Sequence, residues 1–324
     1  MAPETILIYV GLDLVGDGLM KLPFVRRMRA NWPTARIVWC AGKGPSVYAG
    51  SLSPLVSGLI DETIENAGFG SRLRDIVGRP LDGRMCDLVI DTQRRFSTSL
   101  AVRRVRHKRF ISGAAGFRLS DGRPKTAEKP RSMRGQLLQL IEAAGGDPDI
   151  RVEALMLPAD LRATAAHLLP SGPVYVGFAP GAGNRAKCWP FEKFAAAAQA
   201  LPGIVPVFLL GPDEQDWIAS ARAIPGAVLP LQAVEKPSPL LTIALAQRLA
   251  ASLANDAGGG HMLAAGDRPL VSLFGPTDPA KFAPDAKHPT VLRAQDFGAE
   301  TMDAIPLDAV VAALQSSIRT GVAR

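Results

Sequence analysis

The chain has 324 residues, 47% of them hydrophobic and 21% charged, which is the composition of an ordinary globular protein with material for a sizeable core. This length exceeds one ordinary domain and favours two domains of about 150 residues each. No segment approaches the roughly 18 consecutive apolar residues of a membrane helix, and the N-terminus lacks the basic region of a signal peptide. The three cysteines lie far apart and form no CxxC pair, so we expect reduced thiols, no metal site and a cytoplasmic protein.

The first half of the chain alternates short apolar strands with helices. A helix is expected after the loop at 11–18 and as far as Trp32, because Met20, Phe24 and Met28 recur every four residues and give it one apolar face. Further helices are expected at 71–77 and 133–144. The expected strands cover residues 5–10, 36–40, 59–64, 86–91 and 109–112. This alternation predicts a parallel α/β sheet.

The same pattern restarts near residue 158. The expected strands cover 174–179, 205–210, 252–255 and 269–274, and the expected helices cover 158–170, 191–200, 214–223, 240–251, 261–266 and 306–319. We therefore expect one Rossmann-like domain at 1–155, a second at 156–305, and a C-terminal helix at 306–324 that could pack back on the N-terminal domain. Ligands of such sheets bind outside the carboxyl ends of the strands, so the loops after the strands are the candidate sites.

A glycine-rich loop follows the expected strand at 252–255. It carries Asp256, Ala257, three consecutive glycines at 258–260 and His261, and leads into a helix. Glycine lets the backbone approach a ligand closely, and the free N–H groups and dipole of a helix start favour an anion. We therefore expect a phosphate-binding loop, in which Asp256 could cap the helix and His261 could donate to phosphate. The structural alternative is a tight turn with a capping aspartate.

Two further loops follow strands of the same expected sheet. The first runs from Pro180 through Gly181, Ala182 and Gly183 to Lys187; it suits a diphosphate, although its spacing is not that of a Walker A loop. The second contains Asp213 and Glu214. These carboxylates could bind a ribose or a base, or they could simply complement the dipole of the following helix.

One acidic residue stands out in the first half. Asp17 lies between Gly16 and Gly18 after the first strand, where a carboxylate could serve as a general base or as a helix N-cap. Asp13, four residues earlier, could form a carboxylate pair with it.

The net charge of +7 is unevenly distributed. Residues 94–134 hold thirteen Lys and Arg against two acids, a surplus of +11, and begin with Arg94 and Arg95. This segment could attract a phosphorylated or anionic partner, including a membrane surface, or it could be a solvated helical surface. Few aromatic residues accompany it and no nucleic-acid-binding motif occurs, so we expect no nucleic-acid partner.

In this order the motifs resemble glycosyltransferase family 9, the bacterial lipopolysaccharide heptosyltransferases. Its N-terminal pattern is similar to Val15-Gly16-Asp17 followed by Pro23, and its central pattern to Pro180-Gly181 followed by Lys187-Cys188-Trp189-Pro190. The longest match runs from Asn255 to Pro279 and has the form NDxGxxH, then AAGxPxVxLFGPTxP. The resemblance covers nearly the whole chain, with residues 65–160 matching in outline.

The resemblance implies an α/β protein with the GT-B fold, in which two Rossmann-like domains with parallel sheets face a central cleft. It implies an acceptor site in the N-terminal domain and a nucleotide-sugar site in the C-terminal one. The implied reaction is metal-independent inverting transfer of a heptose from an ADP carrier, with the nucleotide sugar as co-substrate and no other cofactor. The implied acceptor is an anionic lipopolysaccharide-type glycolipid, with peripheral contact at the inner membrane face.

Carried over to this chain, the resemblance makes Asp17 the base that deprotonates the acceptor and places Lys187 at the diphosphate. The candidate acceptor-binding residues are Asp13, Gly16, Gly18, Arg94 and Arg95. The candidate nucleotide-sugar-binding residues are Gly181, Ala182, Gly183, Lys187, Asp213, Asp256, Ala257, Gly258, Gly259, Gly260 and His261. Family members often carry hydroxyls where Ala182, Gly183 and Ala257 stand, so we expect backbone N–H groups to hold the diphosphate here.

Two other functions fit the same architecture. A nucleotide-sugar epimerase would act without an acceptor, and a non-catalytic nucleotide-sugar-binding paralogue would bind a donor without turning it over. Asp147-Pro148-Asp149 has the DxD spacing of metal-dependent glycosyltransferases. It follows two glycines at a helix end, which is typical of a polar turn.

Overall fold

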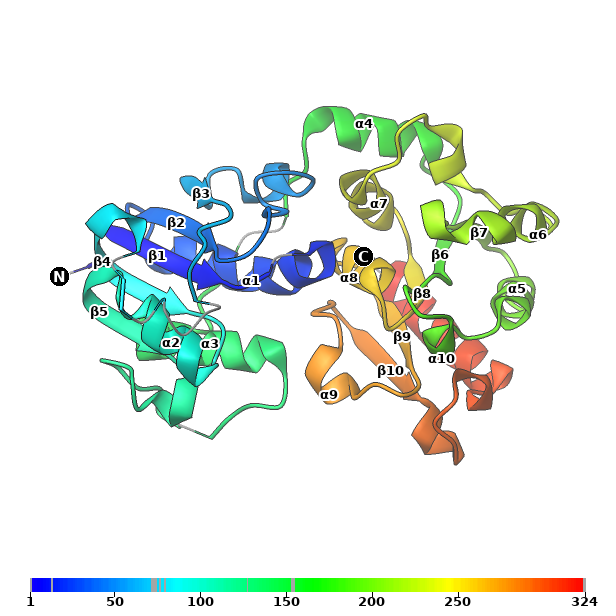
Figure 1. Cartoon of the computed structure of the whole chain (residues 1–324). Coiled ribbons are helices and arrows are strands. Elements are labelled where there is room, and N and C mark those ends of the chain that lie inside the picture. The colour runs from blue at the N-terminus through cyan, green and yellow to red at the C-terminus, as the bar shows by residue number, and fades with distance from the viewer. Residues whose placement is uncertain are drawn as a thin grey trace. The chain divides into compact units, whose positions relative to one another are not determined.

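The computed structural model describes residues 2–12, 14–70, 75, 77–78, 80–126, 128–152 and 155–322. Asp13 and most of the helix expected at 71–77 lie outside these residues. The chain forms two compact units, Met1–Glu153 and Ala154–Arg324. Each unit contains one five-stranded sheet flanked by helices (Figure 1).

The sheet of the first unit has the strand order β3-β2-β1-β4-β5, and every neighbouring pair is parallel. Ile6 in the central strand lies opposite Ile37 on one side and Leu88 on the other. The elements are β1 (Thr5–Val10), α1 (Val15–Asn31), β2 (Arg36–Ala41), β3 (Glu62–Ile64), β4 (Met85–Asp91), α2 (Phe96–Val102), β5 (Arg106–Ser112) and α3 (Met133–Ala143). Continuous apolar runs such as 6–10 are buried, as is typical of a parallel sheet covered on both faces.

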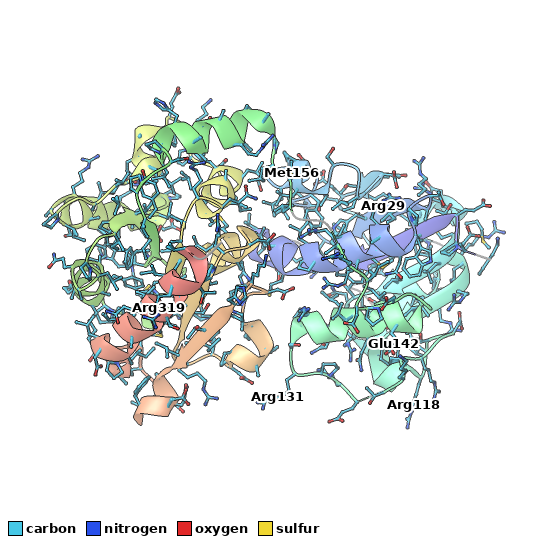
Figure 2. All side chains as sticks on the ribbon, turned by 180° about the vertical axis from the view of Figure 1, so that it is seen from behind. Arg29, Arg118, Arg131, Glu142, Met156 and Arg319 are labelled. Carbon is cyan, nitrogen blue, oxygen red and sulfur yellow. The ribbon has the colours of Figure 1, made fainter. Side chains whose placement is uncertain are left out.

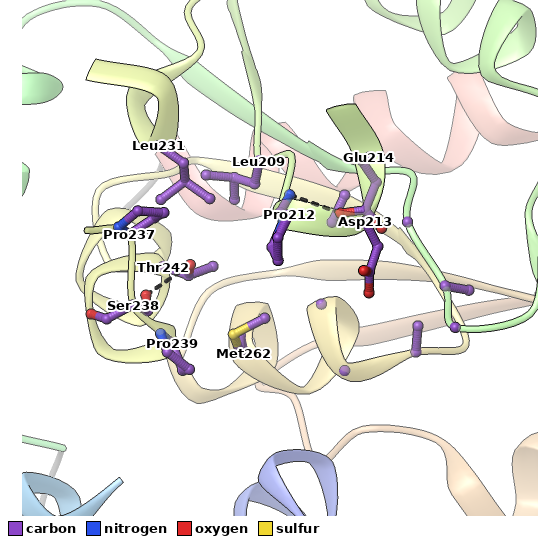
Figure 3. A pocket seen from close by; sticks show the side chains of 18 residues that line it. Leu209, Pro212, Asp213, Glu214, Leu231, Pro237, Ser238, Pro239, Thr242 and Met262 are labelled. Atoms are coloured by element: carbon purple, nitrogen blue, oxygen red, sulfur yellow. Dashed lines mark hydrogen bonds between the residues drawn. The ribbon is translucent and has the colours of Figure 1, made fainter. Parts of the chain in front are cut away.

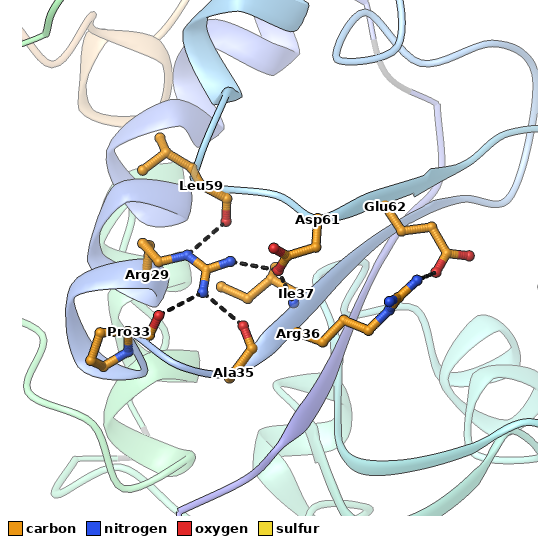
Figure 4. A network of polar contacts seen from close by, with 8 residues as sticks. All are labelled: Arg29, Pro33, Ala35, Arg36, Ile37, Leu59, Asp61 and Glu62. Carbon is orange, nitrogen blue, oxygen red and sulfur yellow. Dashed lines mark hydrogen bonds and ion pairs between the residues drawn. The ribbon is translucent and has the colours of Figure 1, made fainter.

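A partly buried arginine, Arg29, joins the segments at the amino ends of these strands (Figure 4). Arg29, in the last turn of α1, donates to the carbonyl oxygens of Pro33 and Ala35 at 3.0 and 2.7 Å and pairs with Asp61 at 2.6 Å. The same Asp61 oxygen accepts the backbone N–H of Ile37 at 2.7 Å. The end of α1, the start of β2 and the segment before β3 are thereby joined.

The sheet of the second unit has the order β10-β9-β8-β6-β7 and is also parallel. Its strands are β6 (Tyr175–Ala179), β7 (Val205–Phe208), β8 (Ala251–Asn255), β9 (Leu270–Phe274) and β10 (Pro289–Arg293). Its helices are α4 (Ala159–Leu168), α5 (Phe191–Gln199), α6 (Ile218–Arg222), α7 (Pro239–Ala246), α8 (Gly258–Ala265), α9 (Pro279–Phe282) and α10 (Leu307–Val322). The carboxyl ends of β6, β7 and β8 carry the three loops that the sequence singled out.

The parallel α/β class with two sheets is confirmed, and several boundaries differ from expectation. The helix expected at 214–223 is a 3₁₀ segment, η6 (Pro212–Trp217), followed by the short α6. The helix expected at 240–251 ends at Ala246, because Ala251 already pairs in β8. Neither α2 nor β10 was predicted, since both are short and lack a clear periodic pattern.

The C-terminal helix α10 packs on β8, β9 and α5 of the second unit. Its apolar side chains Val310 and Leu314 join the core of this unit, and the expectation that the helix could also pack back on the first domain stays a prediction. Gly321 explains the close approach, because a Cβ there would lie 1.8 Å from the carbonyl oxygen of Ala250. No helix within the described part of the chain is both long and apolar enough to cross a bilayer.

Candidate active site

The loop after β6 is held at both ends by one buried side chain. The amide of Asn255, at the end of β8, donates from Nδ2 to the carbonyl oxygen of Pro180 at 2.7 Å and accepts the backbone N–H of Trp189 at 3.1 Å. Trp189 is itself buried, and its indole N–H donates to the carbonyl oxygen of Ile305 at 3.0 Å. Asn255 thus anchors the 180–189 loop beside the glycine-rich turn that follows β8.

A lysine, an aspartate and a threonine meet next to this loop. Lys187 Nζ lies 2.9 Å from Oδ2 of Asp256, and the Thr277 hydroxyl donates to the same oxygen at 2.5 Å. The Asp256 side chain is 8% exposed and the Lys187 side chain 31% exposed, so the ammonium remains reachable from solvent. Two motifs that are distant in the sequence therefore meet at one carboxylate oxygen of Asp256.

The three glycines form the first turn of α8, which begins at Gly258, three residues earlier than expected. The N-cap residue Ala257 supplies no side-chain cap, so the first amides of the helix are not satisfied by a capping group. A Cβ at Gly259 would lie 3.2 Å from the Cβ of Ala179, and one at Gly260 would lie 3.1 Å from the carbonyl oxygen of Asn255. Two glycines therefore permit close packing on the sheet, while the Cβ position of Gly258 faces open space.

A pocket of about 280 Å³ lies at the carboxyl ends of β6 and β7 and the start of α8 (Figure 3). Its lining includes seven of the predicted nucleotide-sugar-binding residues: Gly181, Ala182, Gly183, Asp213, Ala257, Gly258 and Gly259. The remaining lining residues are Ala179, Leu209, Gly211, Pro212, Glu214, Leu231, Pro237, Ser238, Pro239, Thr242 and Met262. The pocket thus joins a glycine-rich side to an apolar side.

The other four predicted residues lie outside this lining. Lys187, Asp256 and Gly260 are neighbours of the pocket rather than parts of its wall. His261 is half-buried in the first turns of α8, and its backbone N–H donates to the carbonyl oxygen of Ala257 at 3.4 Å.

The apolar side of the pocket was missed in the sequence. Leu231 and Pro237 come from the connection between β7 and α7, Pro239 begins α7, and Met262 comes from α8. Both lining hydroxyls are already used within the fold: Ser238 caps α7 by accepting the N–H of Leu241, and Thr242 donates to the carbonyl oxygen of Ser238. The prolines on either side of the capping Ser238 were the sequence signal for this wall of the pocket, but the same pattern is typical of an ordinary loop before a helix.

Glu214 shapes the polar edge of the pocket. Its Oε2 accepts the backbone N–H of Gly211 at 2.8 Å, and its Oε1 would lie 2.1 Å from a Cβ at position 181. Burial raises the pKa of this carboxyl group, although the Gly211 hydrogen bond opposes the rise. A side chain at position 181 would therefore displace Glu214 from its present position. Asp213 and Glu214 place two carboxyl groups on one wall of the pocket.

In the first unit, Asp17 is the third residue of α1 and not its N-cap, which is Leu14. Gly16 precedes it in the same turn. The next residue, Gly18, is buried: its carbonyl oxygen accepts the Tyr48 hydroxyl at 2.7 Å, and a Cβ there would lie 2.6 Å from a methyl group of Val47. The helix therefore begins earlier than expected and holds Asp17 in its first turn at the carboxyl end of β1.

Arg94 and Arg95 lie in the connection from β4 to α2 and have different surroundings. The Cζ atom of Arg94 lies over the Phe117 ring, 5.4 Å from its centroid, and Nη2 donates to Gln139 Oε1 at 2.6 Å. The buried Nε of Arg94 has no hydrogen-bond partner among the described residues. Burial lowers the pKa of Arg94. Arg95 is exposed as the N-cap residue of α2. Arg94 therefore organises the neighbouring loop, and Arg95 is open to solvent.

A buried carboxyl group supports this connection. Asp91, at the end of β4, accepts hydrogen bonds from the hydroxyls of Ser99 and Ser112 and from the backbone N–H of Gln93. Burial raises the pKa of Asp91, and these hydrogen bonds oppose the rise. The group joins β4, α2 and the end of β5; it was not predicted from the sequence.

Several cations of the basic segment have acidic or carbonyl partners within the first unit. Arg103 pairs with Asp121, Lys108 with Asp87 and Lys125 with Glu142. Arg109 donates to carbonyl oxygens at the end of α3. Arg118 and Arg131 project from the surface of this unit (Figure 2).

The DxD-like sequence forms a turn. The backbone N–H of Asp149 donates to Oδ1 of Asp147 at 2.9 Å, and Asn31 bonds both the N–H and the carbonyl oxygen of Asp147. Within the described ranges, no three His, Cys, Asp or Glu side chains are grouped in a way that could hold a metal ion.

Comparison with known proteins decides the family. The model of glycosyltransferase family 9 (heptosyltransferase) matches residues 75–303. The chain belongs to glycosyltransferase family 9. The protein is therefore a glycosyltransferase. The comparison with curated protein sequences found no significant match.

Solved structures share the fold at low sequence identity. A family 9 glycosyltransferase from Veillonella parvula is 20% identical with a TM-score of 0.69, covering 98% of this chain and 97% of its own. ADP-heptose LPS heptosyltransferase II of E. coli is 20% identical with a TM-score of 0.64, covering 98% and 99%. E. coli heptosyltransferase WaaC, solved with ADP, is 18% identical with a TM-score of 0.68, covering 97% and 99%. The fold of the family 9 chain is therefore GT-B.

Proposed function

We propose that this family 9 protein transfers a sugar, a heptose in the first instance, from an ADP-linked donor to a lipopolysaccharide-type glycan acceptor, with inversion and without a metal. The observation that carries the proposal is the convergence of the 181–183 loop, the start of α8 and Lys187 at one end of one sheet. Structural relatives were solved with ADP and with ADP-2-deoxy-2-fluoro heptose, which makes an adenosine diphosphate donor the first to test.

The donor fits the two sides of the pocket. The apolar side at Leu209, Leu231 and Met262 suits a flat base, and the carboxyl groups of Asp213 and Glu214 suit ribose hydroxyls. The diphosphate would then lie at the 181–183 loop and the first amides of α8, where backbone N–H groups and the helix dipole favour negative charge. Because Ala182, Gly183 and Ala257 carry no hydroxyl, backbone donors supply these contacts.

The leaving diphosphate is stabilised by fixed groups in place of a metal. Negative charge grows on it as the anomeric C–O bond breaks, and the Lys187 ammonium, held beside the start of α8 by Asp256, would stabilise this charge. Asp256 and Thr277 hold Lys187 and the loop together until the donor arrives. These groups are preorganised, so little rearrangement is needed when charge develops.

Asp17 is the proposed general base. In the reaction, an acceptor hydroxyl oxygen forms a bond to the anomeric carbon while the bond to the diphosphate oxygen breaks. The hydroxyl proton passes to the Asp17 carboxylate, and the bond electrons leave with the diphosphate. Attack opposite to the leaving group inverts the anomeric configuration.

The unpaired part of the basic segment is proposed to attract the anionic acceptor, with peripheral contact to an anionic membrane as its consequence. Exposed arginines at 95, 118 and 123 supply the charge. Binding to vesicles that contain phosphatidylglycerol should weaken steeply between low and physiological salt. Salt-insensitive binding would contradict this part of the proposal.

The deciding experiment combines binding with product analysis. Thermal unfolding is followed with ADP, UDP and GDP, and the stabilising nucleotide selects the sugar donors that are then incubated with a lipopolysaccharide-type acceptor. Asp17→Asn should bind the donor like the unchanged protein and lose transfer by about 10²–10⁴-fold. Asp149→Asn, which changes an exposed acid of the same unit, is the matched control and should remain active.

Each alternative has its own outcome. Conversion of the nucleotide sugar without acceptor would favour the epimerase, which family membership already disfavours. Donor binding with no transfer, and no effect of Asp17→Asn, would favour the non-catalytic paralogue. If no nucleotide raises the unfolding temperature, the proposed donor site is wrong.

A further inference from the structure

Arg185 contacts three residues of η6, and these contacts have no role in the mechanism proposed above. Its guanidinium lies over the ring of Trp217, 4.1 Å from the centroid, and Nη2 lies 3.0 and 3.1 Å from the two carboxylate oxygens of Asp216. The same nitrogen lies 3.4 Å from the carbonyl oxygen of Asp213. All three partners belong to η6.

These contacts join two segments that frame the donor pocket. Arg185 begins the 3₁₀ segment η5 (Arg185–Lys187), so it lies two residues before Lys187. The segment η6 carries Asp213 and Glu214 of the pocket wall. Trp217 stacks in turn on Phe191 at 5.4 Å, which connects the contact to the hydrophobic core of the second unit.

Lys187 pairs with Asp256 at the far end of the 181–187 loop, and the residues before it supply few further side-chain contacts. Gly181, Ala182, Gly183 and Ala186 offer no long side chain, and Asn184 bonds within the loop by accepting the N–H of Ala186 at 3.0 Å. Asn255 holds the two ends of the loop, as described above. Ordering several such residues when a ligand binds would cost conformational entropy and therefore affinity.

We propose that Arg185 is a positioning residue that clamps the tip of the 181–187 loop to η6 and so sets Lys187 and the loop amides for the donor diphosphate. The inference rests on the proposed function. The contact is exposed, with 53% and 60% of the Arg185 and Asp216 side chains accessible. Exposed ion pairs add little stability, so the clamp should act on ligand binding rather than on folding.

The first measurement is the affinity of ADP for the whole protein by calorimetry. Arg185→Ala should raise the Kd for ADP by about three- to tenfold, the range expected for an exposed stacked guanidinium with one ion pair. The unfolding temperature should stay the same. In the transferase assay, KM for the donor should rise while kcat changes little. Arg185→Lys should recover little, because an ammonium lacks the planar fork that stacks and pairs here.

The second measurement needs no ligand. The backbone N–H groups of Lys187 and Cys188 donate within η5, at 2.9 Å each, so their hydrogen exchange reports opening of the loop tip. Hydrogen exchange at these amides should be faster in Arg185→Ala than in the unchanged protein. In Trp217→Phe, which keeps a ring under the guanidinium, the exchange rate should lie between those two. Asp216→Ala should reproduce most of the Arg185→Ala effect, and the double variant should add little.

Arg222→Ala is the charge-matched control, because Arg222 is exposed at the end of the neighbouring α6. If Arg185→Ala weakens ADP binding no more than Arg222→Ala, or leaves loop exchange unchanged, the clamp is wrong. If the unchanged protein binds no ADP, UDP or GDP while loop exchange still responds to Arg185→Ala, the proposed function fails and the clamp is only structural.

Discussion

Lys187 and Asp256, 69 positions apart in the chain, form an ion pair of 2.9 Å in which the carboxylate is nearly buried and the ammonium is partly exposed. Thr277 adds a hydroxyl to the same carboxylate oxygen. A buried carboxylate with these two partners keeps the lysine close to the glycine-rich loops.

Replacing the lysine should affect both activity and stability. Lys187→Ala should lower kcat/KM for the donor by about 10²–10³-fold, because a preorganised charge at the leaving group is lost. It should also lower the free energy of unfolding by about 1–3 kcal/mol, since Asp256 loses its cation. Steady-state kinetics and urea unfolding measure the two effects. Lys193→Ala is the matched control, because Lys193 pairs with the exposed Asp303; equal losses in both variants would refute the special role of Lys187.

Asn255 should be indispensable for the donor loop. Asn255→Ala leaves the N–H of Trp189 and the carbonyl oxygen of Pro180 without a partner in a buried place, which should cost about 2–4 kcal/mol of unfolding free energy. Asn255→Asp keeps the acceptor for Trp189 but turns a carboxylate oxygen toward the Pro180 carbonyl. It should therefore be at least as unstable at neutral pH. Chemical unfolding of both variants tests this, and a loss below about 0.5 kcal/mol would contradict the anchoring role.

The two glycines of the 181–183 loop should respond differently to alanine. A Cβ at 181 would collide with Oε1 of Glu214, whereas a Cβ at 183 meets nothing within 4 Å. Gly181→Ala should lower the unfolding free energy by about 1–3 kcal/mol and weaken nucleotide binding, and Gly183→Ala should leave stability nearly unchanged. Thermal unfolding of the pair provides its own control. Recovery of Gly181→Ala by Glu214→Ala would identify the collision directly.

The first unit should carry a pH-dependent contribution from Glu62. The pKa of Glu62 is lowered from 4.5 to about 2, mainly by hydrogen bonds from Arg84. A hydrogen bond from Arg36 lowers this pKa further, whereas burial opposes the shift. Because the folded pKa lies below the unfolded one, the contribution is complete above about pH 5 and is lost as the pH falls toward 2.

Glu62→Gln should therefore lower stability by about 1 kcal/mol at pH 7 and by less at pH 3. Unfolding free energies between pH 2 and pH 7 measure the difference. A constant difference across this range would show that the ion pairs of Glu62 do not stabilise the fold.

The sequence by itself determined the alternation of strands and helices, because continuous apolar runs and helical periodicity are local properties. It also predicted the glycine-rich segments that line the pocket at the carboxyl ends of β6 and β7, since glycine after a strand allows backbones to approach closely. The sequence did not predict that α8 starts at Gly258 and α1 at Val15. A first helical turn without a capping side chain has no recognisable residue pattern at its start.

Only the tertiary structure decided which of these residues meet. Three features form only where segments that are distant in the chain pack together. They are the apolar wall of the pocket with Leu231 and Pro239, the buried position of Asp91, and the contact of Arg185 with Trp217. The same holds for the packing of α10 on β8 and β9, where Gly321 lies against the backbone of Ala250. Local patterns specify the elements, whereas a site is made by long-range packing, which no spacing in the sequence encodes.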